Sequence, residues 1–364
     1  MRTGGPSASG SSGVQPLLAR PFSVTVAVAL AHPWSMTFLP DGRALVTQQP
    51  GTLVLFDPAT AGVTPVPGVP TVVYAGQGGL GDVVLGPTFA SDGGLYLSWV
   101  EAGEAGTAGA VVGRATLRLD GSPRLEGLSV IWRQEPKVSG AGHFGHRIAV
   151  APDGRTIFVT SGERQKFDPA QDLGNNLGSI VRLDLDGSPA PGNPWADRGG
   201  VTAQIWSYGH RNPLGIAFDA AGNLWSSEMG PQGGDEVNLV LPGRNYGWPR
   251  VSNGSHYGGA DIPDHAPGDG FQAPSVWWNP SISPSSLMVY SGALFPQWRG
   301  DAFVGALSGE ALIRVHLDGT TAVLADVWKL GRRIREVEQG PEGSLWLLED
   351  GADARILRLT PAVG

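Results

Sequence analysis

The sequence predicts an all-β fold, a six-bladed β-propeller, because one unit of a turn between two strands recurs along it. Each unit is an apolar run, a turn such as Pro-Asp-Gly, and a second apolar run. Proline presets φ and glycine accepts a positive φ, so this turn joins two short strands. No segment has the apolar spacing of a long amphipathic helix. The units lie at 33–47, 81–100, 145–163, 213–228, 295–318 and 335–350.

The spacing of these units, roughly one per 50–60 residues, is typical of repeat arrays. Closing six small sheets into a ring hides most strand edges, which favours a propeller over the alternative of paired β-sandwiches. The 55 glycines and 30 prolines are dispersed, as expected for one turn-dense domain at 21–364. Residues 1–20 are rich in glycine, serine and proline and predict a flexible leader.

Composition excludes several classes of function. The net charge of −8, without a basic stripe, argues against a nucleic-acid partner. No apolar run is long enough to span a bilayer, and the leader lacks the apolar core of a signal peptide. The chain is therefore expected to be cytoplasmic or already trimmed. The absence of cysteine excludes disulfides, thiolate metal sites, cysteine nucleophiles and haem attachment through C-x-x-C-H.

Several polar residues, far apart in the sequence, occupy one kind of place. Gln77, His143, Arg211 with Asn212, and Arg333 with Arg335 each precede a repeat unit. Loops that enter repeated sheet units converge at one end of a closed fold. Cations, a base and an amide gathered there suit a planar, polyanionic ligand. The two strand arginines alternate, so both face the same way; a solvated strand face is the alternative.

These residues carry a resemblance that runs from about His32 to Leu359. Its motifs are HPWSMTFLPDGRALVT, GQGGLGDVVLGPTF, HFGHRIAVAPDG, QDLGNNLGSIVRLDLDGS, GHRNPLGIAFD, EMGPQGGDEVNLVLPGRNYGWP, PSISPSS and RIREVEQGPEGSLWLL. In this order they resemble the soluble quinoprotein glucose and aldose-sugar dehydrogenases, the glucose/sorbosone dehydrogenase family. The resemblance implies a six-bladed propeller, pyrroloquinoline quinone (PQQ) with a calcium ion, and oxidation of an aldose at its anomeric carbon to the lactone. Electrons must then pass to an external acceptor such as a quinone, dye or cytochrome.

The resemblance also implies a general base. His143 matches the catalytic histidine, and a neutral imidazole near its own pKa suits removal of a hydroxyl proton. His146 is the competitor, and a structural loop histidine is the alternative for either. Gly142 stands where some relatives have an acidic residue, so a partner that orients the imidazole must come from elsewhere.

Further roles are implied around the cofactor. The backbone carbonyls of Gly230 and Pro231 map to calcium ligands. Arg211 maps to a second cation that stabilises charge developing on the quinone. Asn212 maps to a cofactor hydrogen bond, and Gln77 to positioning of substrate and cofactor.

Arg333 and Arg335 are implied to bind cofactor carboxylates through paired guanidinium donors. Ser308 stands where some relatives hold a carboxylate with lysine, which predicts weaker cofactor affinity. Ser281 and Arg164 are weaker candidates for cofactor contacts.

A structural calcium loop is implied at Glu236, through its carboxylate, and Tyr246, through its carbonyl. A surface carboxylate pair, Asp235 and Glu236, is the alternative. Two other functions of six-bladed propellers stay open: a calcium-dependent lactonase and a non-catalytic binding module. We expect a monomer or weak homodimer in the periplasm or outside the cell.

Overall fold

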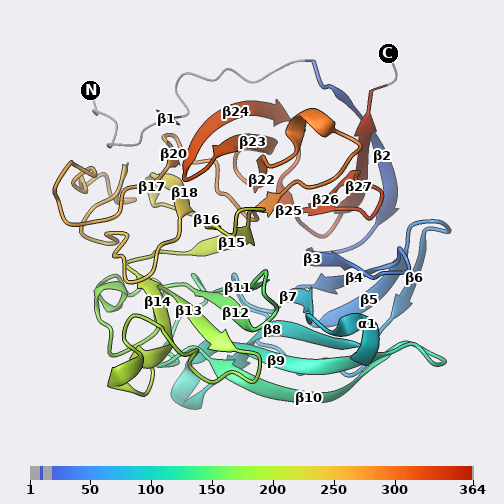
Figure 1. Ribbon diagram of the computed structural model, residues 1–364, viewed down its shortest axis with the longest axis horizontal. Coiled ribbons are helices and arrows are strands. Elements are labelled where there is room, and N and C mark those ends of the chain that lie inside the picture. Colours follow the sequence, from blue (N-terminus) through green and yellow to red (C-terminus); the bar gives the residue numbers. More distant parts are fainter. Residues whose placement is uncertain (1–8, 11–18, 363–364) are drawn as a thin grey trace.

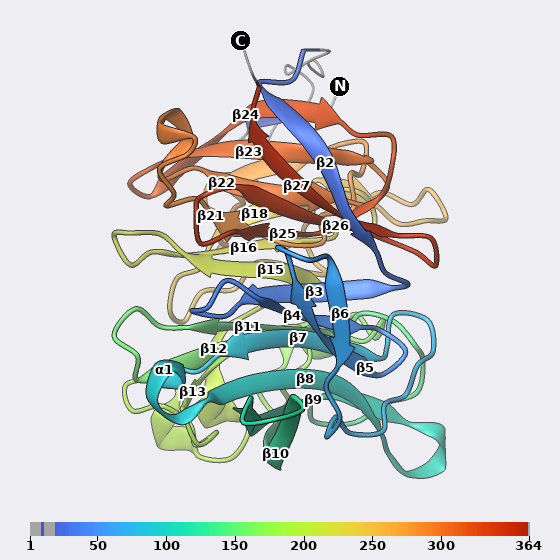
Figure 2. The ribbon, with the colours of Figure 1, turned by 90° about the vertical axis from the view of Figure 1, so that its right-hand side faces the viewer.

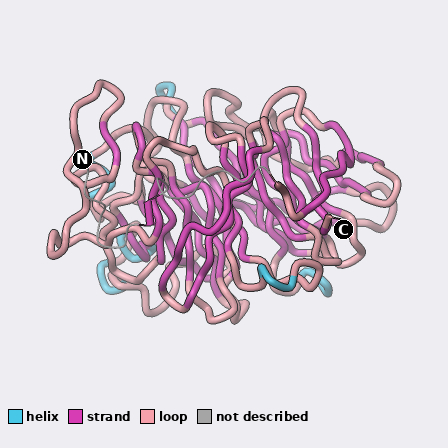
Figure 3. Tube along the Cα trace, turned by 90° about the horizontal axis from the view of Figure 1, so that it is seen from above, coloured by secondary structure: helices cyan, strands magenta, loops and turns pink. Residues whose placement is uncertain are grey.

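The computed structural model describes residues 9–10 and 19–362, and these form six antiparallel sheets arranged around a central axis (Figure 1). The predicted six-bladed β-propeller is confirmed. Strands fill the middle of the molecule and loops gather at its two faces (Figure 3). Within the described residues, no helix is both long and apolar enough to cross a bilayer.

Each blade has four main strands, which follow one another from the axis outward. Blade 1 is β3 (Pro33–Phe38), β4 (Ala44–Gln48), β5 (Thr52–Asp57) and β6 (Gly62–Pro65), and blade 2 is β7 (Leu80–Leu85), β8 (Gly94–Ala102), β9 (Ala108–Arg118) and β10 (Arg124–Arg133). Blade 3 is β11 (Gly145–Val150), β12 (Thr156–Ser161), β13 (Ser179–Asp184) and β14 (Ile205–Tyr208), and blade 4 is β15 (Pro213–Phe218), β16 (Leu224–Glu228), β18 (Asp235–Leu239) and β20 (Val276–Trp278). Blade 5 is β21 (Met288–Val289), β22 (Ala302–Ala306), β23 (Ala311–Asp318) and β24 (Thr321–Lys329), and blade 6 is β25 (Ile334–Gln339), β26 (Leu345–Glu349), β27 (Arg355–Pro361) and β2 (Phe22–Ala29).

The remaining elements are short. A two-stranded sheet, β17 (Gln232–Gly233) with β19 (Gly254–Ser255), lies in the long connections of blade 4, and β1 (Ser9–Gly10) pairs in parallel with β20. The helical elements are α1 (Phe89–Asp92) and the 3-10 turns η2 (Glu104–Gly106), η3 (Asp168–Gln171), η4 (Ala196–Arg198), η5 (Thr202–Gln204) and η6 (Pro296–Trp298). Most of the predicted leader, 1–20, lies outside the described residues, so the domain boundary stays a prediction.

The sixth blade closes the ring with strands from both ends of the chain. β2 pairs antiparallel with β27, from Phe22 opposite Pro361 to Ala29 opposite Arg355. The two strands run side by side along one edge of the molecule (Figure 2). The Phe22 ring anchors β2, because it meets the rings of Trp298 and Trp328 edge-on at 6.3 and 5.3 Å. The N-terminal strand β2 is thus the outermost strand of a blade whose other three strands come from the C-terminal end of the chain.

The repeated turns lie between the first and second strands of a blade, so the segments entering the first strand and leaving the second strand meet at the opposite face. The fifth sequence unit does not begin at the first strand of its blade, as the other five do. The sequence suggests it begins at 295, whereas its innermost strand is β21, and a long loop containing η6 separates β21 from β22. Short, separated strands give no continuous apolar pattern, which explains the shift.

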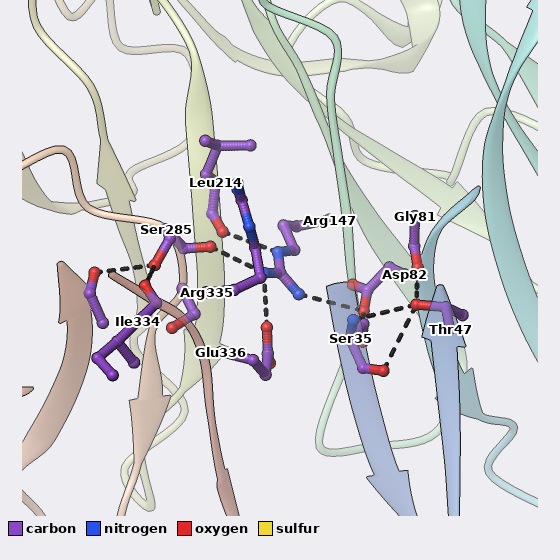
Figure 4. A network of polar contacts seen from close by, with 12 residues as sticks. Ser35, Thr47, Gly81, Asp82, Arg147, Leu214, Ser285, Ile334, Arg335 and Glu336 are labelled. Atoms are coloured by element: carbon purple, nitrogen blue, oxygen red, sulfur yellow. Dashed lines mark hydrogen bonds and ion pairs between the residues drawn. The ribbon is translucent and has the colours of Figure 1, made fainter. Parts of the chain in front are cut away.

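At the axis, one arginine joins five of the blades (Figure 4). Arg147, on β11, donates to the carbonyl oxygens of Leu214 and Ser285, each at 2.8 Å. Its guanidinium pairs with Glu336 at 2.6 Å and lies 3.5 Å from Asp82. Burial raises the pKa of Glu336 well above its usual range, although Arg147 opposes this. This network crosses the axis, and Asp82, Arg147 and Glu336 also line a cavity of about 300 Å³ between the innermost strands.

Candidate functional site

A cavity of about 520 Å³ opens at the face where the blade entries meet. This volume is in the range of small-molecule sites. Blade entries and second-strand exits supply most of its wall. The lining includes His32, Trp34, Gln49, Gln77, His146, Leu214, Met229, Tyr257, Ser283, Leu307, Arg333, Arg335 and Asp350. The structure therefore brings Gln77 and both strand arginines to one place, as the sequence predicts.

His143 stands beside this cavity, in the loop that enters β11. Its backbone N–H donates to Oε1 of Gln77 at 2.7 Å, so Gln77 fixes the loop that carries the imidazole. Its Nδ1 hydrogen bonds to the carboxylate of Glu163. Burial lowers the pKa of His143, and the Arg211 charge adds to this effect, while Glu163 opposes it. With the Nδ1 proton directed at Glu163, Nε2 keeps its lone pair and can accept a proton.

Glu163 is the orienting partner that sequence analysis required but did not identify. It follows β12, so it leaves the second strand of blade 3 at the site face. Its carboxylate also accepts the backbone N–H groups of Gln165 at 3.0 Å and Phe167 at 2.6 Å. Burial works against its ionisation, but the hydrogen bonds, led by that from His143, outweigh it and lower the pKa of Glu163. The missed signal was an acidic residue directly after a second strand.

His146 is fully packed and neutral. Its Nδ1 lies 2.8 Å from Oγ of Ser98, and its ring stacks on Trp34 with centroids 5.0 Å apart. Burial lowers the pKa of His146 to about 3. A Cβ on Gly81 would come within 2.0 Å of this ring, so only glycine fits beside it. His146 therefore fits a structural role in the cavity wall better than the role of general base.

Arg211 and Asn212 precede β15 and adjoin the His143–Glu163 pair, because the backbone N–H of Glu163 donates to the carbonyl of Arg211 at 2.9 Å. Nη1 of Arg211 donates to the carbonyls of Met229 at 3.0 Å and Gly230 at 2.7 Å, and Nη2 lies 3.3 Å from the Tyr257 hydroxyl. The Nε of Arg211 and both polar atoms of the Asn212 side chain are buried without a hydrogen-bond partner in the described structure. Buried polar groups rarely remain unpaired, so these atoms suit a bound polar ligand.

Arg333 and Arg335 share one carboxylate at the cavity wall. Nε of Arg333 lies 2.8 Å from Asp350, and Nη2 of Arg335 lies 2.7 Å from it. Burial opposes the ionisation of Asp350, but the two guanidinium groups outweigh it and lower its pKa. Two cations against one anion leave a net positive charge for an anionic ligand. Asp350, which follows the second strand of blade 6, also escaped sequence analysis.

The two weaker candidates for cofactor contacts do not line the cavity. Arg164 does not line the cavity, because its guanidinium donates to the carbonyls of Gly142, Ala108 and Gly140 and burial lowers its pKa to about 10. It supports the loop that carries His143 instead of offering a free cation.

The second of these candidates is Ser281. The serine at the cavity wall is Ser283, not Ser281. The Ser283 hydroxyl lies 2.8 Å from that of Ser308, which places Ser308 next to the cavity.

A small void of about 10 Å³ lies beside Arg211 and is lined by Glu228, Gly230, Glu236 and Tyr246, among others. Burial and the nearby Glu228 charge raise the pKa of Glu236 well above its usual range. Asp235 and Glu236 are both buried, so the alternative of a surface carboxylate pair is wrong. The described residues hold no cluster of three or more acidic, histidine or cysteine side chains around one point. Any cation here would need backbone carbonyls as ligands.

Comparisons with known proteins agree with this architecture. Residues 30–358 match the family model described as glucose/sorbosone dehydrogenase. The chain is 38% identical over 358 residues to aldose sugar dehydrogenase YliI of Escherichia coli (strain K12), with 95% of each chain covered. The apo-form structure of the soluble aldose sugar dehydrogenase from E. coli superposes with a TM-score of 0.88, covering 94% of this chain and 100% of that one at 38% identity.

A further solved structure contains a cofactor. The PQQ-bound form of aldose sugar dehydrogenase from Streptomyces coelicolor superposes with a TM-score of 0.79 at 31% identity, covering 95% of this chain and 99% of that one. The family model spans most of the chain, and the E. coli relative covers nearly all of it. The chain therefore belongs to the glucose/sorbosone dehydrogenase family.

Proposed function

We propose that this protein oxidises aldose sugars at the anomeric C1 hydroxyl to the lactone, with PQQ as the bound electron acceptor. The observation that carries the proposal is the buried His143–Glu163 pair beside a cavity walled by Arg333 and Arg335. One side of this site can remove a proton, and the other can hold an anionic ligand. The electrons then leave to an external quinone, dye or cytochrome.

The residues present fit PQQ, a planar molecule with three carboxylates. Arg333 and Arg335 supply two guanidinium groups whose charge Asp350 only half neutralises. The orphaned side-chain amide of Asn212 can both donate to and accept from a polar ring. When bound, PQQ supplies the quinone that accepts hydride from the sugar. The PQQ-bound structure of the Streptomyces relative supports this choice of cofactor.

His143 would act as the general base. Its lowered pKa keeps the imidazole neutral at neutral pH, so Nε2 can take the C1 hydroxyl proton as hydride leaves the carbon. Glu163 holds the Nδ1 proton in place and stabilises the imidazolium that forms. The Arg211 guanidinium, held by the carbonyls of Met229 and Gly230, stabilises negative charge developing beside it.

Calcium is the second part of the proposal. The carbonyls of Gly230 and Pro231 would hold one ion near Arg211, where a divalent cation would add to the same charge stabilisation. The Gly230 oxygen accepts Nη1 of Arg211 at 2.7 Å, so it would serve both cations through its two lone pairs. The Glu236 carboxylate and the Tyr246 carbonyl would hold a structural ion at the small void. The unpaired Oδ1 of Asn238 and the raised pKa of Glu236 support a missing positive charge there.

The two alternative functions fit the site less well. A lactonase needs several carboxylate and asparagine side chains around a central metal, and the acidic groups at the axis lie around Arg147 instead. A binding module needs neither a buried histidine–carboxylate pair nor paired arginines. A periplasmic or secreted location, and a monomer or weak homodimer, belong to the same proposal.

Reconstitution tests the function. We expect purified, chelator-treated protein to reduce dye with aldoses only after both PQQ and calcium are added. The arginines would hold PQQ, and the bound PQQ would complete the calcium site that the backbone carbonyls begin. His143→Ala in the same assay should lose about 10²–10⁴-fold in kcat while still binding PQQ. Sugar oxidation by the cofactor-free protein, or lactone hydrolysis in place of oxidation, would contradict the proposal.

A further inference from the structure

Gln134 is a buried amide that the proposed mechanism does not use. It follows β10, the outermost strand of blade 2, and its side chain is fully buried. Its Oε1 accepts the backbone N–H of Ala110 at 3.2 Å, and its own backbone N–H donates to the carbonyl of Ala110 at 2.8 Å. Glutamine is mostly found at the surface, because burial costs it rotamer entropy and leaves its polar atoms to be paired. Gln134 is thus anchored to β9 at two points, and its amide nitrogen is free to bond elsewhere.

The amide nitrogen of Gln134 reaches blade 3. Nε2 donates to Oγ of Ser161 at 2.9 Å and to the carbonyl of Gly162 at 3.0 Å, and the carbonyl of Phe144 lies 3.4 Å away. A reversed carboxamide would set its oxygen against two carbonyls and its N–H groups against the N–H of Ala110. The partners therefore fix the orientation of the amide, and through it they join blade 2 to blade 3.

The groups that Gln134 holds flank the proposed base and its carboxylate. Phe144 directly follows His143, and Gly162 directly precedes Glu163. The two segments also bond to each other, since the N–H of Gly162 donates to the carbonyl of Phe144 at 3.2 Å. One side chain therefore spans both segments that carry the His143–Glu163 pair.

These two segments are close together, and the backbone of one of them is strained. A Cβ on Gly162 would come within 2.2 Å of the carbonyl oxygen of His143, so only glycine fits there. His143 has a φ of 52°, in the left-handed region that residues with a Cβ rarely adopt. Such a backbone persists only where its surroundings impose it. Gln77 fixes the N–H of His143, and Gln134 fixes the adjoining segment at Gly162.

We propose that Gln134 is a positioning residue for the proposed general base, and that it keeps the Glu163 carboxylate at Nδ1 of His143 by joining the segments that carry them. The proposal deepens the proposed function and rests on it. Gln134 does not line the cavity, so it acts through the pair and not on the sugar or PQQ. The amide is uncharged. Its removal therefore changes the geometry of the pair and leaves in place the charges around the imidazole, which are those of Glu163, Arg211 and Arg164.

The test is Gln134→Met, which keeps the size of the side chain and removes its polar atoms, after reconstitution with PQQ and calcium. We expect kcat to fall about 10–100-fold, because a misplacement of about 1 Å at a catalytic group can cost about 10²-fold. KM for D-glucose and PQQ affinity should stay within about threefold, since neither ligand contacts Gln134.

Asn193→Leu is the matched control. Asn193 is a buried amide between β13 and β14 that donates to the carbonyls of Arg182 and Ala203, each at 2.8 Å, and it does not line the cavity. Its replacement removes a comparable pair of hydrogen bonds and should lower the temperature of unfolding. It should nevertheless leave kcat within about twofold of the unaltered protein.

A double-mutant cycle separates positioning from a general loss of stability. Added to His143→Ala, Gln134→Met should cost less than about twofold in kcat, because the group that it positions is already gone. A second measurement uses the PQQ-free protein. In Gln134→Met, hydrogen exchange should become faster locally, at the backbone N–H groups of Gly162 and Arg164, which donate to Phe144 and His143.

Ser161→Ala, which removes the nearest acceptor of the amide, replaces Gln134→Met if the latter does not fold, and it should lower kcat in the same non-additive way. An unchanged kcat, or a fall in kcat that is equal with and without the His143 imidazole, would overturn the assignment of Gln134 alone. A similar fall in Asn193→Leu would do the same. An unaltered protein that oxidises no aldose would overturn the proposed function and this inference with it.

Discussion

At the scale of single residues, the chemistry of the site depends on one imidazole and the carboxylate behind it. Burial makes His143 a weaker base than a free histidine, and Glu163 partly restores its basicity. The pair therefore sets both the orientation of the imidazole and the pH at which it becomes neutral.

Glu163→Gln tests this coupling through the pH profile. A general base must be neutral, so activity should rise with pH through the pKa of His143, which lies below the usual value near 6.5. Because Glu163 raises that pKa, its removal should move the acid limb of the kcat/KM profile to still lower pH and reduce kcat. An acid limb that moves upward would contradict the assignment.

The arginines separate binding from catalysis. Arg335→Ala or Arg333→Ala removes a cation from a cofactor carboxylate, so PQQ should bind more weakly by about 2–5 kcal/mol, with turnover recovered at saturating PQQ. Arg211→Ala should instead lower kcat when PQQ is saturating. PQQ titration with dye reduction measures both. Unchanged PQQ affinity in both the Arg333 and the Arg335 variant would contradict a role of these arginines in cofactor binding.

Ser308→Lys, next to Ser283, should tighten PQQ binding.

At the scale of the elements, each polar residue of the site is placed by the strand that it precedes or follows. Sequence analysis found residues that precede the innermost strand of a blade, such as Gln77 and Arg333, because a recognisable turn follows that strand. It missed Glu163 and Asp350, which leave second strands, because no turn motif marks that end. It misjudged Arg164, since a sequence does not show that neighbouring carbonyls will occupy a guanidinium.

The β2 strand gives a prediction at this scale. Phe22→Ala removes the ring that packs against Trp298 and Trp328, and such truncations in a core cost about 3–5 kcal/mol. Chemical unfolding should show this loss, whereas Val24→Ala, at a half-exposed position of the same strand, should cost far less. Equal effects would mean that β2 does not close the ring through this contact.

At the scale of the whole molecule, the fold could be predicted from the period of its turns, whereas the polar contacts at the propeller axis could not. The pairing of Arg147 with Asp82 and Glu336 joins residues from three blades, and their sequence spacing carries no sign of contact. The fifth blade shows the same limit, because β21 is too short to produce a pattern. Local chemistry thus predicted the repeat, and long-range packing completed it.

Arg147→Met tests the axis. It leaves two buried carboxylates without their cation, a loss that typically costs about 3–5 kcal/mol. The midpoint of chemical unfolding should fall accordingly, while Arg155→Ala, an exposed arginine near the turn that follows β11, serves as the control. An unchanged midpoint would show that the network does not hold the blades together.

The pairing of β2 with β27 also has a consequence during protein synthesis. β2 leaves the ribosome before the main strands of the other five blades, but its partner β27 is made last, after more than 320 intervening residues (from Ala29 to Arg355). At about 5–20 residues per second, this is a wait of roughly 15–70 s. During that time the valines of β2 and the Phe22 ring have no blade to join. The nascent chain therefore carries an unpaired, apolar strand for most of its synthesis, and a chaperone that shields this segment would increase the yield of closed rings.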